Sequence, residues 1–117
     1  MDQSELIARL RLIRTRHIGP MTYGLLMRRY GSAKAALAAI PAMAKRGGRH
    51  ISLASIASAK AELDLIKASG AVLLWRDSEY YPDRLAMYDD ATACITAKGN
   101  LHLLTQPMIA IVGARNA

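Results

Sequence analysis

The chain lacks several features that define common protein classes. A single cysteine, Cys94, in 117 residues excludes an internal disulfide and a metal site of clustered cysteines. The three histidines have no carboxylate or thiol neighbours at ligand spacing, so we expect no metal centre and no cofactor. No stretch of about 18 apolar residues suggests a transmembrane helix, and no apolar core of a secretory signal is present at the N-terminus. We therefore expect a cytoplasmic protein with no membrane partner.

Acidic residues are scarce in the first half of the chain. Residues 1–60 hold eleven Lys and Arg against Asp2 and Glu5, whereas residues 61–117 hold five against seven acids. The formal net charge of +7 therefore comes from the first half. A strongly basic segment favours a polyanionic partner, nucleic acid first. A basic surface that only aids solubility is the alternative.

Residues 4–30 predict two helices joined by a sharp turn. Apolar residues recur at helical spacing over residues 4–17, and the helix is expected to break at Ile18-Gly19-Pro20. A second helix is predicted over residues 22–30, with Thr22 as N-cap and Gly31 after its end. This pattern resembles a helix-hairpin-helix element, in which the turn and the next N-terminus present backbone N–H groups to a DNA phosphate. The alternative is a plain helical hairpin.

Two more helices complete the predicted helical module. The third is expected over residues 33–40, beginning after Ser32 and ending at Pro41. Residues 45–50 follow as a basic, glycine-bearing loop, and a fourth helix runs from Ser52 or Ser55 to Gly70. Five arginines near the hairpin or in this loop are candidate auxiliary DNA contacts: Arg16, Arg28, Arg29, Arg46 and Arg49. The alternative for the loop is a flexible, solvated connection.

The pattern changes after Gly70 to short strands that alternate with short helices. Strands are predicted over residues 71–75, 93–96 and 109–112, a short helix begins at Tyr81-Pro82, and Asn100 caps a single turn. Such alternation favours an α/β unit. We therefore predict an α+β chain, with an all-α helical domain over residues 1–70. Residues 71–117 are predicted to be the truncated start of a Rossmann-type domain.

The third predicted strand leads directly into a glycine, within the stretch Met108 to Asn116. Residues 109–112 are expected to form a buried parallel strand, and Gly113 a tight turn whose N–H groups face an anion. The missing Cβ would let the backbone approach a phosphate, on which the Arg115 guanidinium would close. A single glycine is not a dinucleotide fingerprint. The alternative is an ordinary strand end.

Few aromatic side chains qualify for stacking on bases. Single-strand binding calls for exposed rings beside Lys or Arg, which leaves Tyr30 and the pair Tyr80–Tyr81. Trp75 ends a predicted strand and Cys94 lies within another. We expect both to be core residues rather than functional groups.

The order of several motifs is more specific than any one of them. The Gly-Pro and Tyr-Gly-Ser of the helical module are followed by Tyr81-Pro82-x-x-Leu85, Lys98-Gly99-Asn100 and Val112-Gly113-Ala114-Arg115. This order resembles the DNA-processing protein A family (DprA, also called Smf) over essentially the whole chain. The resemblance implies a SAM-like helical domain followed by an extended Rossmann domain.

The same resemblance implies a function and a site. It implies a non-enzymatic protein that binds single-stranded DNA and hands it to the RecA recombinase in natural transformation. The DNA-phosphate pocket would comprise Gly113, Ala114 and Arg115, with Lys98 as a weaker candidate. In the family, the surfaces for homodimer formation and for RecA lie beyond the last motif, so neither surface is assigned to this chain, which resembles the N-terminal part of the family.

Two other function classes remain open. A Rossmann-type nucleotide-binding enzyme, similar to phosphoribohydrolases, would use the Gly113 turn for a nucleotide phosphate, although no acid–base pair or nucleophile is apparent near it. In a helical protein-interaction module, the charge of residues 1–60 would be incidental.

Overall fold

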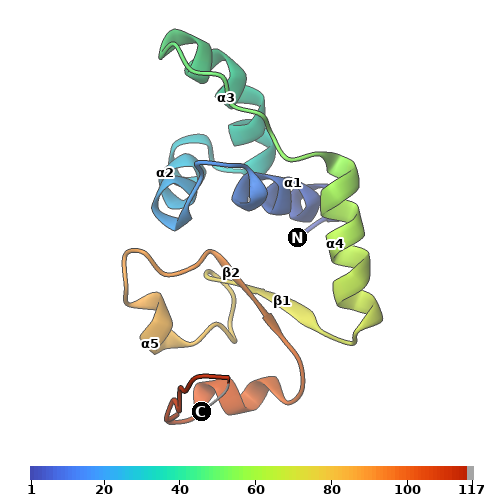
Figure 1. The fold of residues 1–117 in the computed structure, drawn as a ribbon, viewed down its shortest axis with the longest axis vertical. Coiled ribbons are helices and arrows are strands. Elements are labelled where there is room, and N and C mark those ends of the chain that lie inside the picture. Colours follow the sequence, from blue (N-terminus) through green and yellow to red (C-terminus); the bar gives the residue numbers. More distant parts are fainter. Residues whose placement is uncertain (116–117) are drawn as a thin grey trace.

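The computed structural model describes residues 1–115 and has a helical part followed by a small β part (Figure 1). The helical part comprises α1 (Gln3–Arg14), α2 (Pro20–Tyr30), α3 (Ala33–Arg46) and α4 (Ile56–Ala68). The β part comprises β1 (Val72–Trp75), the short helix α5 (Asp83–Ala86), β2 (Cys94–Ala97) and the 3-10 helix η1 (Leu101–Thr105). This arrangement confirms the predicted α+β class. None of the helices in the described chain is long and apolar enough to cross a membrane.

Side-chain caps start three of the four long helices. Asp2, Ser32 and Ser55 each accept a hydrogen bond from the backbone N–H three residues later, at 2.8 to 3.1 Å. The exception is α2, which follows Gly19 without a side-chain cap and has Pro20 in its first turn. Its start therefore lacks the hydrogen-bond acceptor that the other three helices have.

The turn between α1 and α2 differs from the prediction at both ends. The first helix ends at Arg14 rather than continuing to residue 17, and His17 takes the left-handed conformation at φ 73°. The second helix begins at Pro20, so the prediction of Thr22 as its N-cap was wrong. Proline suits the first helical position because its φ is preset and its missing N–H has no intrahelical acceptor there.

The third helix continues past its proline, so the prediction that Pro41 ends it was wrong. The helix runs to Arg46, which is therefore its last residue and not part of a loop. Pro41 itself is exposed, whereas Ile40 and Ala44 are 1% and 8% exposed and pack into the core. Burial of the apolar residues beside Pro41 offsets the hydrogen bond that a proline removes.

A single hydrophobic core joins the helical part to the β part. Its largest fully buried side chains are Leu10, Leu12 and Ile40. Trp75 of β1 is 5% exposed and stacks on Tyr23 of α2, with ring centroids 6.3 Å apart. Trp75 is thus a core residue, as expected. The predicted division into two domains near residue 70 stays a prediction, because residues of this one core lie on both sides of that position.

The sheet consists of β1 and β2 paired antiparallel, with Val72 opposite Ala97 and Trp75 opposite Cys94. The parallel strand predicted over residues 109–112 is not present in the described chain. Ile109, Ile111 and Val112 are each more than 90% exposed, and the segment has no regular structure. A strand needs a neighbour to hydrogen-bond its backbone, and no described segment pairs with this one.

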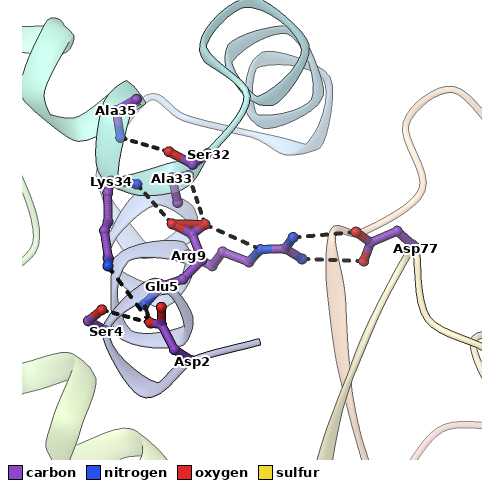
Figure 2. A network of polar contacts seen from close by, with 9 residues as sticks. All are labelled: Asp2, Ser4, Glu5, Arg9, Ser32, Ala33, Lys34, Ala35 and Asp77. Atoms are coloured by element: carbon purple, nitrogen blue, oxygen red, sulfur yellow. Dashed lines mark hydrogen bonds and ion pairs between the residues drawn. The ribbon is translucent and has the colours of Figure 1, made fainter.

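A carboxylate of α1 holds the start of α3 (Figure 2). Glu5 accepts hydrogen bonds from the backbone N–H groups of Ala33 at 2.9 Å and Lys34 at 3.1 Å. It also lies 3.8 Å from Arg9, whose guanidinium reaches both carboxylate oxygens of Asp77 at 3.3 and 3.4 Å. The network therefore ties α1 both to α3 and to the segment after β1.

Candidate nucleic-acid interface

Three arginines of α1 make tertiary contacts within the fold. Besides the Arg9–Asp77 pair, Arg11 Nε donates to the Ala54 carbonyl at 2.8 Å, and Arg14 donates to both Glu62 carboxylate oxygens at 2.7 to 3.1 Å. The hydrogen bonds with Glu62 raise the pKa of Arg14 further above its ordinary value. Much of the positive charge of α1 thus holds the fold together.

The start of α2 is open to an anion. The backbone N–H groups of Met21 and Thr22 have no hydrogen-bond acceptor among the described residues. A helix N-terminus carries a partial positive charge and unsatisfied N–H donors, which suit a phosphate. This matches the position at which the helix-hairpin-helix resemblance predicts a DNA phosphate.

A groove of about 610 Å³ extends from this N-terminus along α2 to the segments beside β1 and β2. Its α2 wall includes Pro20, Met21 and Leu25, and the last two are more than half exposed. The opposite wall includes Asp89 and Ala91, from the segment before β2. The groove therefore combines an open helix N-terminus with apolar side chains that a base could contact.

Three arginines line this groove, and they are not equivalent. Arg9 is paired with Asp77, while Arg76 Nη2 donates to the carbonyls of Ala86 at 2.6 Å and Tyr88 at 2.8 Å. Arg28 has no hydrogen bond or ion pair within the described residues, and Asp89 also lines the groove. Arg28 is therefore the groove cation that is available to bind a ligand.

The guanidinium of Arg28 lies beside Gly24 of the same helix. The position that a Cβ would take on Gly24 is 3.5 Å from Arg28 Nη1, so the guanidinium lies back along α2 over this glycine. The sequence spacing of four residues is the one at which helix side chains meet. The contact between Gly24 and Arg28 was not predicted from the sequence, because it depends on the rotamer of Arg28.

The predicted phosphate pocket is exposed in the structure. Gly113, Ala114 and Arg115 lie in a segment without helix or strand, and nothing comes within 4 Å of a Cβ built on Gly113. Asn116, the last residue of the same predicted stretch, lies outside the described residues. Lys98 is exposed after β2, with its Cε 3.9 Å from a Cβ built on Gly70. No hydrogen bond in the described chain connects Lys98 with the segment 113–115.

The five auxiliary arginines are all exposed, and they fall into two groups. Arg16 lies in the α1–α2 turn, and Arg28 and Arg29 lie in the last turn of α2. Arg46 and Arg49 lie at the far end of α3, which projects away from the β part (Figure 1). The fold therefore places only the first group on or beside α2, and of these residues Arg28 lines the groove.

The stacking candidates change once the fold is known. Tyr81 is 3% exposed and its hydroxyl donates to the Thr92 carbonyl at 2.7 Å, so it is a structural residue and no longer a candidate. Tyr30 is partly buried under the guanidinium of Arg29, 5.3 Å from its ring centroid. Tyr88 is 65% exposed, and its carbonyl holds Arg76. Sequence reasoning passed over Tyr88 because Arg76 lies twelve residues away in the chain.

The environment of Cys94 does not favour a reactive thiolate. Cys94 is partly buried against the core, and burial raises the pKa of its thiol to about 11. A thiol with a raised pKa is a poor nucleophile at neutral pH. Within residues 1–115, no group of three or more His, Cys, Asp or Glu is arranged to hold a metal ion.

Comparison with known protein families shows to which family the chain belongs. Residues 3–64, more than half of the chain, match the family described as the DprA-like N-terminal HHH domain. Residues 72–117 match the family described as DNA recombination-mediator protein A. The chain belongs to the DprA family. The resemblance inferred from the order of the motifs is thus confirmed.

Membership of the DprA family assigns the chain to DNA recombination mediators. This favours the DNA-processing class over the phosphoribohydrolase-like enzyme that the Gly113 turn left open. A comparison with curated proteins found no match. The α1–α2 hairpin lies within the part of the chain that matches the HHH domain, whereas the groove wall opposite α2 lies within the part that matches DNA recombination-mediator protein A.

Proposed function

We propose that this DprA-family chain binds single-stranded DNA through the α1–α2 hairpin and the adjoining groove. The observation that supports this most is the open N-terminus of α2, which leads into a groove lined by the unengaged cation Arg28. One phosphate would accept hydrogen bonds from the N–H groups of Met21 and Thr22, and the next would lie near Arg28. Tyr88 offers an exposed ring on which a base could stack.

A second contact is proposed at Gly113, Ala114 and Arg115, with Lys98, as the family resemblance implies. The exposure of all four residues supports it, because a phosphate can reach each of them. Binding at both places would be largely electrostatic. Affinity should therefore fall steeply as the salt concentration rises.

The test is fluorescence anisotropy of labelled single-stranded and duplex oligonucleotides, titrated with the chain at several salt concentrations. Arg28→Ala should weaken binding of the single strand by about five- to tenfold at low salt and reduce the salt slope by about one phosphate contact. Arg84→Ala is the matched control, since Arg84 is exposed on α5 and does not line the groove. An equal effect of the two variants would refute the role of the groove.

The Arg115→Ala variant separates the two proposed contacts. If both sites bind the strand, Arg115→Ala and Arg28→Ala should each weaken binding, and the double variant should weaken it more than either. If only Arg115→Ala has an effect, the phosphate pocket lies at the Gly113 turn and the hairpin proposal fails. Equal affinity for duplex and single strand would contradict the single-strand preference.

We also propose that bound DNA is passed to the RecA recombinase, a step that family membership supports. Because the family resemblance places the RecA surface beyond the last motif, the expected result is faster assembly of RecA filaments on single strands when a longer family chain that carries both this region and that surface is present. Arg28→Ala in that longer chain should reduce this acceleration in proportion to its loss of DNA binding. Unchanged assembly rates at saturating amounts of the longer chain would refute the handover.

A further inference from the structure

A second groove, of about 470 Å³, lies between α1 and α3 and is separate from the proposed DNA site. It shares no lining residue with the groove along α2. Most of its lining is apolar and comes from α1, α3, the segment before α4 and the first residue of α4: Ile7, Ala8, Leu37, Ala38, Leu53 and Ile56. Ile56 is 54% exposed, so part of this apolar surface faces solvent. The proposed function makes no use of this surface.

The spacing of the lining residues defines an elongated receptor surface. Ser4, Ile7, Ala8 and Arg11 lie on one face of α1, at intervals of three, one and three residues, and the α3 wall begins at Lys34. Residues at such intervals form a continuous stripe along a helix. A cleft between two such stripes fits side chains that are themselves presented at helical spacing, as in the helix-in-groove mode of recognition.

Both charged side chains in the lining are cations. Lys34 is 52% exposed and lies 3.8 Å from Asp2, which is 68% exposed, so this pair is weak and a ligand carboxylate could replace Asp2. Arg11 uses only its Nε, on the Ala54 carbonyl, and its terminal nitrogens have no partner within the described residues. Glu5, the other nearby acid, is already held at the start of α3.

We propose that the α1–α3 groove docks an acidic amphipathic helix of a partner protein. Apolar side chains of that helix would fill the groove, and its carboxylates would pair with Arg11 and Lys34. Nucleic acid fits the groove less well because no aromatic side chain lines it, and a phosphate backbone would leave the apolar surface uncovered.

The test uses a fluorescein-labelled helical peptide of about four turns, with leucines at positions i, i+3, i+4 and i+7 and glutamates along both sides of the leucine stripe. A second peptide carries lysine in place of each glutamate. Anisotropy should show binding of the acidic peptide at micromolar concentrations and at least about tenfold weaker binding of the lysine peptide, a difference of about 1.4 kcal/mol.

Matched variants of the chain locate the binding site. Ala38→Glu places a carboxylate in the groove and should weaken binding of the acidic peptide by at least about tenfold. Ala35→Glu makes the same change at an exposed alanine of α3 outside the groove and should leave binding within about twofold. Lys34→Glu and Lys45→Glu form a second pair with the same expectation. Circular dichroism verifies that each variant is folded.

Three results would overturn this proposal. The first is no binding of the acidic peptide, and the second is equal binding by Ala38→Glu and Ala35→Glu. The third is a loss of oligonucleotide binding in Ala38→Glu while peptide binding persists, which would assign the groove to nucleic acid. Arg28→Ala should leave peptide binding unchanged, so this proposal and the proposed DNA site succeed or fail independently.

Discussion

Removal of the Glu5 carboxylate should destabilise the whole helical part, although Glu5 lies in the first turn of α1. Glu5 accepts two backbone hydrogen bonds at the start of α3, from Ala33 and Lys34 (Figure 2). Ala33 is 0% exposed, so its N–H cannot turn to water when the carboxylate is absent. A buried donor left without a partner costs about 1–3 kcal/mol, and a hydrogen bond to a charged group contributes about 1.5–3 kcal/mol.

For Glu5→Ala we expect the free energy of unfolding to fall by about 3 kcal/mol. The fall is smaller than the sum over both hydrogen bonds, because the two contributions overlap and because Lys34 is partly solvated. Glu5→Gln keeps an acceptor oxygen but loses the charge that favours a helix N-terminus, so we expect a loss of about 1–2 kcal/mol. The assay is urea unfolding followed by circular dichroism, with the midpoint falling and the slope unchanged. Glu79→Ala is the control, since Glu79 is exposed and makes no ion pair in the described chain. If Glu5→Ala and Glu79→Ala agree within about 0.5 kcal/mol, the argument for a tertiary cap fails.

Two further perturbations probe the proline inside α3 and a buried tyrosine of the core. Pro41→Ala should raise the free energy of unfolding by about 1–3 kcal/mol, because the new residue supplies an N–H donor for the Leu37 carbonyl and α3 already spans this position. The control is Pro107→Ala, which lies outside any helix and should not raise the free energy of unfolding. Burial raises the pKa of Tyr23 to about 12, above its ordinary value of 10.0, so the unfolded chain ionises first and stability should fall by about 2–3 kcal/mol between pH 10 and pH 12. Urea titrations across this pH range should show a smaller fall in stability for Tyr23→Phe than for the parent chain, and equal stability of the two proteins at pH 8. An identical decline in both proteins at alkaline pH would contradict the assignment of the fall to Tyr23.

The distribution of positive charge illustrates how the fold selects among similar residues. The sequence places eleven basic residues in positions 1–60 without distinguishing them. In the folded chain, Arg9, Arg11 and Arg14 connect α1 to other segments, whereas Arg28 stays unengaged within the described residues. A charge-reversal experiment on Arg14 would therefore test folding rather than DNA binding. Such variants cannot discriminate between a DNA-binding and a protein-interaction module.

Local chemistry determined much of the fold directly from the sequence. Ser32 and Gly31 located helix boundaries correctly, because caps and left-handed glycines act within a few residues of the chain. For the fourth helix the sequence left Ser52 and Ser55 as alternatives, and the structure has Ser55 as the cap. The two strands near Trp75 and Cys94 were also predicted, since a short apolar run bounded by turns is a local signal. The order of the motifs was sufficient to indicate the DprA family, because it too is a property of the sequence.

Other features depended on contacts between distant segments. Pro41 is tolerated only because Ile40 and Ala44 are buried beside it, and residues 109–112 form no strand because no described neighbour pairs with them. The groove along α2 exists because Trp75 packs on Tyr23 and brings the β part against that helix. The sequence alone determined the presence of the four long helices, the caps at Ser32 and Gly31, and the family. Only tertiary packing decided which strands pair and which arginines remain available to bind DNA, since both depend on residues far apart in the chain.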